Sequence, residues 1–326
     1  MAIGVSDYLM EIYEARKDQV DWSQSSRQIA KLLGISPTSV GKLKQLRVSE
    51  LGEDAIKRKF EAIEGPGSDK PRPTHLVIGD AHAAPGQSLG RFLLLGRMIR
   101  DIRPDVVICI GDWADMESLS HYDKGKRSFE GRRYSRDIDV ANRALALLHQ
   151  PIDEHNAQYP DNPVQPRFVY CEGNHEYRIE RAKIDSPGID AIDLSDIDFE
   201  RRGWEVFRFL KPAEIDGVMY CHYLTSQNTA RAIGGVNAAR SLLLKKHISC
   251  VVGHSHLLNY NTTMAGMSRR MHALVCGYYC DVPQTYAEQS NAGWWPGICV
   301  LRRVEDGDYD LELWSMRRIR DRWKNR

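Results

Sequence analysis

The segment from His75 to His256 decides the fold, and it begins with His-Leu-Val-Ile-Gly-Asp-Ala-His over residues 75–82. A short run rich in β-branched or aromatic residues, followed by a polar turn containing glycine, predicts a buried strand that ends at a loop. The same kind of run recurs four more times before His256. The five predicted strands cover residues 75–78, 106–110, 168–170, 218–220 and 248–252.

Each predicted strand brings polar side chains to the loop that follows it. The five loops carry Asp80-Ala-His82, Gly111-Asp112-Trp-Ala-Asp115, Gly173-Asn174-His175-Glu176, a lone His222, and Gly253-His254-Ser-His256. Oxygen and imidazole ligands at rigid strand ends are what a site for two divalent metals needs. A single one of these histidines would more often be a structural residue, but the ordered set of five predicts one shared site.

The ordered set resembles the calcineurin-like metallophosphoesterases, whose motifs run D-x-H, G-D-x-x-D, G-N-H-E/D, H and G-H-x-H. The resemblance extends from residue 74 to about residue 300, and it implies an α/β fold, a four-layer α/β/β/α sandwich that hydrolyses phosphate esters with two divalent ions. It makes Asp112 the bridging ligand. The other implied ligands are Asp80, His82 and His256 for one ion, and Asn174, His222 and His254 for the other.

The resemblance also implies that His175 is a general acid, which protonates the leaving oxygen while a metal-bridging hydroxide attacks phosphorus. Asp115 is expected to orient His175. Arg178 is a candidate phosphate clamp, with a surface salt bridge as the alternative role. Met116 and Tyr223 depart from the phosphoprotein phosphatases, which carry Arg and commonly Gly there, so the sequence argues against a protein Ser/Thr phosphatase. Mn, Fe, Zn and Ni all suit these ligands, and Mn is favoured.

Residues 1–64 are predicted to form a small all-α domain that resembles a helix-turn-helix. One helix follows Ser25 or Ser26, and the next begins at Pro37 after a turn. Five basic residues and no acidic ones lie between Ser26 and Arg47, which favours DNA binding. The expected DNA contacts are Thr38, Ser39, Lys42 and Lys44. The alternative is a helical module that packs on the enzyme or mediates oligomers.

Residues 65–73 are rich in Gly and Pro and are predicted to be a linker, and residues 74–326 form the predicted dimetal phosphoesterase domain. Strands of a second sheet are expected over residues 264–277, 297–304 and 309–314. The pair Trp294-Trp295 precedes one of them, and core packing is the more frequent role of such a pair than base stacking. A basic loop over residues 121–136 is either a polyanion contact or a solvated loop.

The composition narrows the possible partners. The chain has 45 Lys and Arg residues against 44 Asp and Glu, so a nucleic-acid contact must come from local patches. No apolar run has the length of a membrane span, and the seven scattered cysteines suit a reducing compartment, so a cytoplasmic protein is expected. The sequence leaves the oligomeric state open.

The predicted substrate is a phosphodiester of nucleic acid or nucleotide. One alternative is a phosphomonoesterase acting on nucleotides or phosphoproteins. The other is a DNA-binding regulator whose metal domain is idle.

Overall fold

The computed structural model describes residues 6–22, 24–47, 72–121, 125–186, 188–189, 191–226, 229–266, 269–280 and 292–324. The chain divides into two compact units, Met1–Lys70 and Pro71–Arg326, which are treated separately below. Of the predicted linker over 65–73, only residues 72 and 73 are among the described residues.

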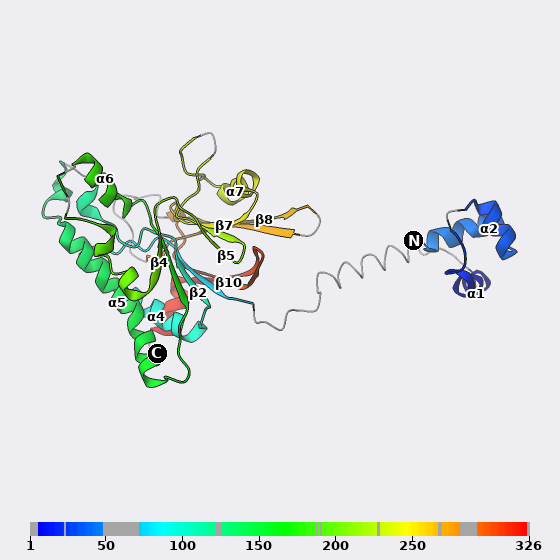
Figure 1. Ribbon diagram of the computed structural model, residues 1–326, viewed down its shortest axis with the longest axis horizontal. Helices are drawn as coiled ribbons and strands as arrows, with labels where there is room; N and C mark the ends of the chain where they lie inside the picture. Colours follow the sequence, from blue (N-terminus) through cyan, green and yellow to red (C-terminus); the bar gives the residue numbers. More distant parts are fainter. Residues whose placement is uncertain are drawn as a thin grey trace. The chain divides into compact units, whose positions relative to one another are not determined.

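The first unit contains helix α1 (Asp7–Arg16), helix α2 (Ser26–Leu33) and a third helix over residues 37–47 (Figure 1). Ser25 and Gln28 form a reciprocal capping box at the start of α2, and Gly34 ends that helix in the left-handed conformation. At the third helix, the Ser36 hydroxyl accepts a hydrogen bond of 3.1 Å from the backbone N–H of Ser39. The two predicted helices are therefore each begun by a serine cap.

Apolar residues at helical spacing form the interior of this unit. Tyr13, Ile29, Val40 and Leu43 are fully buried. The indole of Trp22 packs on Tyr13 and donates a hydrogen bond to the Lys17 carbonyl. The turn between α2 and the third helix thus holds their apolar faces together.

The second unit is built on two β-sheets (Figure 1). The first sheet has the order β11-β10-β1-β2-β3-β4, in which β1 to β4 are parallel. Its strands are β1 (His75–Ile78), β2 (Val106–Cys109), β3 (Arg167–Cys171), β4 (Trp204–Phe207), β10 (Gly297–Glu305) and β11 (Asp308–Ser315). The second sheet has the order β5-β6-β7-β9-β8. Its strands are β5 (Ala213–Ile215), β6 (Val218–Tyr220), β7 (Ser249–Val252), β8 (Leu258–Ala265) and β9 (Arg269–Cys276).

Helices cover the outer face of each sheet. The first sheet is covered by α4 (Gly90–Ile102), α5 (Tyr134–Gln158) and α8 (Met316–Trp323), and the second by α7 (Ala238–Lys246). Helix α6 (Tyr177–Asp185) follows β3, and the short 3₁₀ helices are Glu117–Leu119, Arg127–Phe129, Leu194–Asp196 and Glu200–Arg202.

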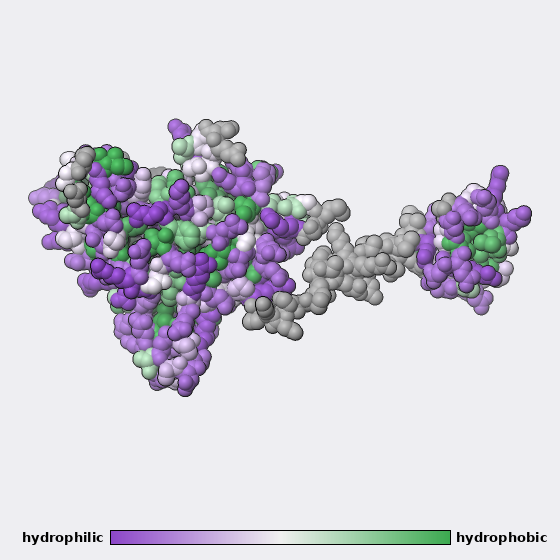
Figure 2. Space-filling model, viewed as in Figure 1, coloured by the Kyte–Doolittle hydropathy of each residue, from purple (hydrophilic) through white to green (hydrophobic). Residues whose placement is uncertain are grey.

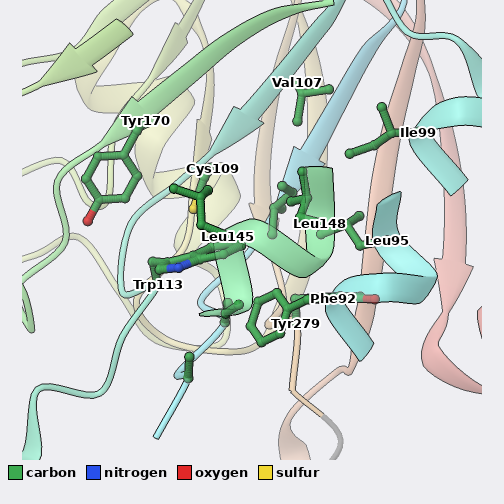
Figure 3. Packing of buried hydrophobic residues seen from close by; sticks show 14 of the residues in the cluster. Phe92, Leu95, Ile99, Val107, Cys109, Trp113, Leu145, Leu148, Tyr170 and Tyr279 are labelled. Atoms are coloured by element: carbon green, nitrogen blue, oxygen red, sulfur yellow. The ribbon is translucent and has the colours of Figure 1, made fainter. Parts of the chain in front are cut away.

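Side chains of β1 show how the layers form. Leu76 and Ile78 join the core beneath the helices, whereas Val77 joins the core between the sheets. Figure 3 shows the helix-covered core, where Phe92 and Leu95 lie near Trp113 and Tyr279. The predicted four-layer α/β/β/α sandwich is confirmed.

The sheet to which the C-terminal strands belong was predicted wrongly. Strands β10 and β11 join the first sheet, where β10 pairs antiparallel with β1. The region predicted as one strand over 264–277 overlaps two strands, β8 and β9, which pair with each other. Local patterning identifies a strand, but the free edge of β1 that receives β10 is created only by the fold.

The visible surface is mostly hydrophilic (Figure 2), and the cysteines lie in the interior. In Figure 2 the visible faces of both units are mostly hydrophilic, with only small groups of hydrophobic residues. All seven cysteines are buried thiols. Burial raises the thiol pKa of Cys221 to about 11 and that of Cys250 to about 12. Among the described residues, no helix combines the length and apolar character that a membrane crossing requires.

Candidate metal centre

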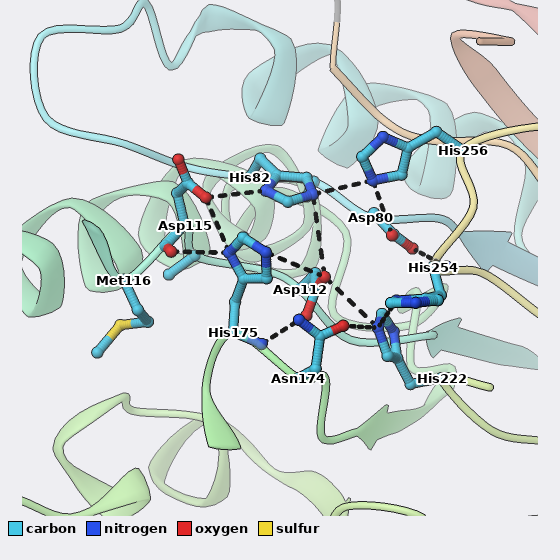
Figure 4. A network of polar contacts seen from close by, with 12 residues as sticks. Asp80, His82, Asp112, Asp115, Met116, Asn174, His175, His222, His254 and His256 are labelled. Atoms are coloured by element: carbon cyan, nitrogen blue, oxygen red, sulfur yellow. Dashed lines mark hydrogen bonds and ion pairs between the residues drawn. The ribbon is translucent and has the colours of Figure 1, made fainter. Parts of the chain in front are cut away.

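The predicted site residues converge at the carboxyl ends of strands from both sheets (Figure 4). Strands β1, β2 and β3 lead to Asp80, Asp112 and Asn174. Strands β6 and β7 lead to His222 and the loop that carries His254 and His256. Parallel strands end at the same edge of a sheet, so this topology brings distant parts of the chain to one place.

Asp80, His82 and His256 form the first of three overlapping groups that could hold a metal ion. The Oδ2 atom of Asp80 lies 3.0 Å from Nε2 of His256. The Nε2 atoms of His82 and His256 are 3.1 Å apart. Two imidazole nitrogens and a carboxylate oxygen thus point at one small volume, as ligands of a cation do.

Asp112, His222 and His254 form a second group. Nε2 of His222 lies 3.4 Å from Asp112 Oδ2 and 3.3 Å from His254 Nδ1. The side-chain oxygen Oδ1 of Asn174 is 2.9 Å from the same His222 nitrogen. Asn174 therefore adds a neutral oxygen to this group.

Asp112 belongs to two of the three groups, because the remaining one consists of His82, Asp112 and His175. Its Oδ2 atom lies 4.0 Å from His82 Nε2 and 3.7 Å from His175 Nε2. The Asp112 side chain is 2 % exposed, so its charge must be balanced inside the protein. Its central position suits a ligand shared by two cations.

Hydrogen bonds behind two of the rings test whether they suit a metal. Nδ1 of His222 lies 2.9 Å from the Ile110 carbonyl oxygen, and Nδ1 of His82 lies 3.2 Å from Asp115 Oδ1. An Nδ1–H that donates outward leaves the Nε2 lone pair facing the centre, which is the usual arrangement of metal-ligating histidines. The donor set therefore fits divalent ions.

The ionisation of the two buried aspartates agrees with this fit. Burial alone would raise the pKa of Asp80 and Asp112. The surrounding histidines outweigh burial and lower the pKa of both carboxyl groups. The centre therefore contains carboxylate anions in the neutral pH range.

His175 belongs only to the third group, and two residues hold its ring. Its Nδ1 atom is 2.8 Å from both the carbonyl oxygen and Oδ1 of Asp115. Arg178 donates to the carbonyls of Asp115 and Met116, and its Nη2 lies 3.1 Å from His175 Nε2. Burial would lower the pKa of His175, but the Asp112 and Asp115 carboxylates raise it overall.

Glu176 has a structural role that was not predicted from the sequence. This fully buried carboxylate accepts hydrogen bonds from the backbone N–H groups of Asp112, at 3.1 Å, and Ala114, at 2.8 Å. Burial and the charge of Asp112 raise the pKa of Glu176 to about 7. Through Glu176, the G-N-H-E motif therefore holds the backbone of the G-D-x-x-D loop. The glutamate at the fourth position of the motif was the sequence feature that could have indicated this role.

The loops of the centre adopt an uncommon backbone conformation. His82, Asp112, His254 and His256 have φ values of 46°, 48°, 68° and 59°. Non-glycine residues seldom adopt positive φ, and such residues concentrate at functional sites. Gly173 permits the close approach of two loops, because a Cβ there would lie 2.1 Å from the Asp112 nitrogen.

Thr38 and Ser39 lie at the start of the third helix of the first unit, and Lys42 and Lys44 lie farther along it. Thr38 and Lys42 are exposed, and Ser39 is half-buried. The ammonium group of Lys44 donates to the Gln24 carbonyl at 2.5 Å, so Lys44 is tied to its own unit. Thr38 and Lys42 are therefore the most exposed of the four.

A search among curated proteins gave no match. Three solved structures that resemble the chain at low identity are a protein of Thermus thermophilus, the Pseudomonas putida nuclease MPE, and Yfce, a phosphoesterase from E. coli. They are 10 %, 12 % and 11 % identical to it, with TM-scores of 0.34, 0.29 and 0.31. The matches cover 75 %, 74 % and 73 % of this chain and 99 %, 87 % and 98 % of the respective structures.

The family assignment rests on a different comparison. The model of the calcineurin-like phosphoesterase family matches residues 74–261, which include every residue of the three groups above. The chain therefore belongs to the calcineurin-like phosphoesterases and is a metal-dependent phosphoesterase.

Proposed function

We propose that this chain hydrolyses phosphodiesters of nucleic acid or nucleotides with two divalent ions, of which Mn is the preferred candidate. The position of Asp112 in two of the three overlapping Asp and His groups carries the proposal. The first ion would be held by Asp80, His82, Asp112 and His256. The second would be held by Asp112, Asn174, His222 and His254.

Two divalent ions in such a site neutralise the phosphoryl oxygens and lower the pKa of water. The protein's own residues supply position and a proton. Asp115 fixes the Nδ1 side of His175, which leaves Nε2 on the side of Asp112. This orientation supports the proposal that His175 donates a proton to the leaving oxygen.

Arg178 is proposed to bind the substrate phosphate. Its guanidinium group is anchored by the carbonyls of Asp115 and Met116 and reaches the ring of His175. The sequence analysis considered a phosphate clamp or a surface salt bridge for Arg178, and neither role includes these contacts to backbone carbonyls. An anchored guanidinium next to the general acid could form charge-assisted hydrogen bonds with a phosphoryl oxygen.

Basic residues in the segment after Asp115 support the proposal that the substrate is a phosphodiester within an extended polyanion. The loop after Asp115 carries the exposed side chains of Arg127 and Arg133, and Arg136 is exposed in the first turn of α5. Arg132 binds Glu117 and so ties this loop to the segment that follows Met116. A polymeric substrate would place further phosphates along such a surface.

The comparison of a diester with a monoester tests the proposal. The protein is stripped of metal with a chelator and reloaded with Mn, Fe, Zn or Ni. Its kcat/KM is then measured on bis-p-nitrophenyl phosphate and p-nitrophenyl phosphate. Preference for the diester is expected. Preference for the monoester would indicate a phosphomonoesterase, and no hydrolysis with any metal would indicate an idle domain.

The helical unit over residues 1–64 is proposed to bind DNA through its third helix. Thr38 and Lys42 would face the DNA, because the start of the second helix of a helix-turn-helix enters the major groove. In a gel-shift titration of the full chain, Lys42→Ala should weaken binding and reduce its salt dependence. Arg16→Ala removes one positive charge from an exposed position at the end of α1, outside the basic cluster, and is the matched control. No binding by the unchanged chain at low salt would contradict the proposal.

A further inference from the structure

An aromatic wall stands beside the first ligand group. The ring of Trp294 lies 4.1 Å from that of His256, centroid to centroid, at an interplanar angle of 83°. Tyr278 stacks on His256 at 5.3 Å and contacts Trp294 at 5.4 Å. The backbone N–H of Trp295 donates to the His256 carbonyl, which holds the segment in place. Trp294 and Tyr278 are called the Trp294 wall below.

A second aromatic wall stands beside the other ligand group. Tyr223 directly follows His222, and its ring centroid lies 4.8 Å from that of His254. Phe209 packs against Tyr223 at 5.6 Å, and Tyr177 stacks on Phe209 at 4.4 Å. These three rings are called the Tyr223 wall. The two walls flank the centre on the sides of its two ligand groups.

The tryptophan pair divides into a core residue and a site residue. Trp295 packs with the core between the sheets, and its ring fills the space that a Cβ at Gly277 or Gly297 would need. Trp294 instead lies against a proposed metal ligand and remains half-buried, as does Tyr223 in the other wall. Rings that only brace histidines would be expected to lie wholly inside, as Tyr278 does.

The chemistry of the flanks indicates what they bind. The scissile phosphate must lie over Asp112 to reach the proposed ions, so the groups on either side of it approach the two walls. Each nucleobase offers a flat π face, and stacking of one base on an aromatic side chain is worth about 1–3 kcal/mol. In a duplex those faces are already covered by neighbouring base pairs.

We propose that Trp294 and Tyr223 stack the two nucleobases that flank the scissile phosphate, so that the substrate is an unpaired nucleic-acid strand. This inference rests on the proposed phosphodiesterase function and specifies its substrate. The exposed Arg127, Arg133 and Arg136 would follow the backbone of the strand beyond the site.

The test uses the full-length, metal-loaded protein and three dinucleotides. One is a thymine dinucleotide, and in the others an abasic tetrahydrofuran unit replaces the 5′ or the 3′ nucleoside. Loss of one base should lower kcat/KM about 5- to 150-fold, which is the stacking energy expressed as a rate ratio. Trp294→Ala should lower kcat/KM on the intact dinucleotide similarly, and should cause little further loss on one of the abasic compounds. Tyr223→Ala should show this pattern with the other abasic compound.

Matched variants separate stacking from damage to the site. Trp294→Phe and Tyr223→Phe keep a ring and should retain most of the activity. Tyr159→Ala removes an exposed ring at the end of α5 and should have no effect. Equal losses by Trp294→Ala on intact and abasic compounds would overturn the inference, as would faster cleavage of a duplex than of its separated strand. A uracil ribodinucleotide, run in parallel, identifies whether the preferred strand is DNA or RNA.

Bis-p-nitrophenyl phosphate distinguishes the two levels of failure. If the wild-type protein hydrolyses it but not the dinucleotide, the stacking inference fails while the phosphodiesterase proposal stands. If neither compound is hydrolysed, the proposed function itself fails.

Discussion

Histidines at the two ends of the sheets have opposite surroundings. At the carboxyl ends, the nitrogens of His82, His222 and His256 point toward carboxylates and toward one another. Toward the other end, His75 at the start of β1 and His272 in the middle of β9, beside Ser249 at the start of β7, are each held between one tyrosine and one aspartate. The same residue type serves as a candidate ligand at one end and as a brace at the other.

The bracing histidines join the two sheets. Nδ1 of His75 lies 2.6 Å from the Tyr220 hydroxyl and Nε2 lies 2.9 Å from Asp216 Oδ2, both on the second sheet or its turn. His272, on the second sheet, reaches Asp308 at the start of β11 in the first sheet. Both ring nitrogens are therefore used by protein groups. A ring with one nitrogen bound behind and the other facing both a carboxylate and a second imidazole is the one to suspect as a ligand.

The largest effect is expected from Asp112→Asn, which removes the shared anion of the ligand end. Loss of several kcal/mol of transition-state stabilisation should lower kcat about a thousandfold or more. Elemental analysis after dialysis should show fewer bound ions per chain. Asp139→Asn, on the exposed face of α5, is the control and should leave both values unchanged. Full metal occupancy with a near-normal rate would remove Asp112 from its central role.

His175→Ala should lower the rate about 100- to 10,000-fold, because a general acid is lost, while the ions stay bound. The loss should be smaller for a nitrophenyl ester than for an alkyl ester, because a good leaving group needs little protonation. Kinetics on matched diesters that differ only in the leaving group check this. An equal loss on both would contradict the acid role of His175.

His75→Phe acts on the bracing end and should affect stability and not catalysis. The change leaves the buried Tyr220 hydroxyl without its partner, which costs about 1–3 kcal/mol in the free energy of unfolding. Urea unfolding measures this loss, and kcat per folded molecule should be unchanged. His121→Phe, at a surface ion pair, should stay within about 0.5 kcal/mol of the wild type. A large fall in kcat for His75→Phe would break the proposed division between the two ends.

The smallest effect concerns pH and His149, a third histidine outside the site. Burial lowers the pKa of His149 to about 4, and its Nε2 accepts a hydrogen bond of 2.8 Å from the Trp204 indole. A lowered histidine pKa means that the unfolded chain takes up the proton first, so stability falls as the pH drops from about 6.5 toward 4.

His149→Gln keeps an acceptor but does not titrate. It should therefore reduce the stability lost between pH 7 and pH 5 by about 1–2 kcal/mol. Urea unfolding at both pH values measures the difference. Identical pH dependence in variant and wild type would show that His149 does not contribute.

Much of the fold follows from local pattern. The strand that leads to each motif is visible because buried strands need continuous apolar runs. The helix predicted to follow Ser25 or Ser26 appears as Ser26–Leu33. The partner of β10 was not predictable in this way, because strand pairing depends on which sheet edge is free after the chain has folded. Strand identity is local, whereas sheet membership is not.

The site likewise has features that local sequence indicates and features that depend on the folded structure. Residue type and order indicated which side chains converge, since ligands must be Asp, His or Asn at strand ends. The buried carboxylate of Glu176 and the anchored guanidinium of Arg178 were not assigned their contacts, because each acts on backbone groups of a distant loop. The left-handed conformation of His254 and His256 was also invisible in a sequence without glycine at those positions.

The burial of the cysteines has a practical consequence for labelling the protein with dyes. All seven thiols are buried, and burial raises the thiol pKa of Cys109, Cys171, Cys276 and Cys299 as well as of Cys221 and Cys250. Thiolate is the reactive form, so the native chain should react slowly with maleimides. One cysteine introduced at an exposed position in each unit would then be the dominant dye-labelling site there. The distance between the helical and phosphoesterase units thereby becomes accessible to fluorescence energy transfer without removing any natural cysteine.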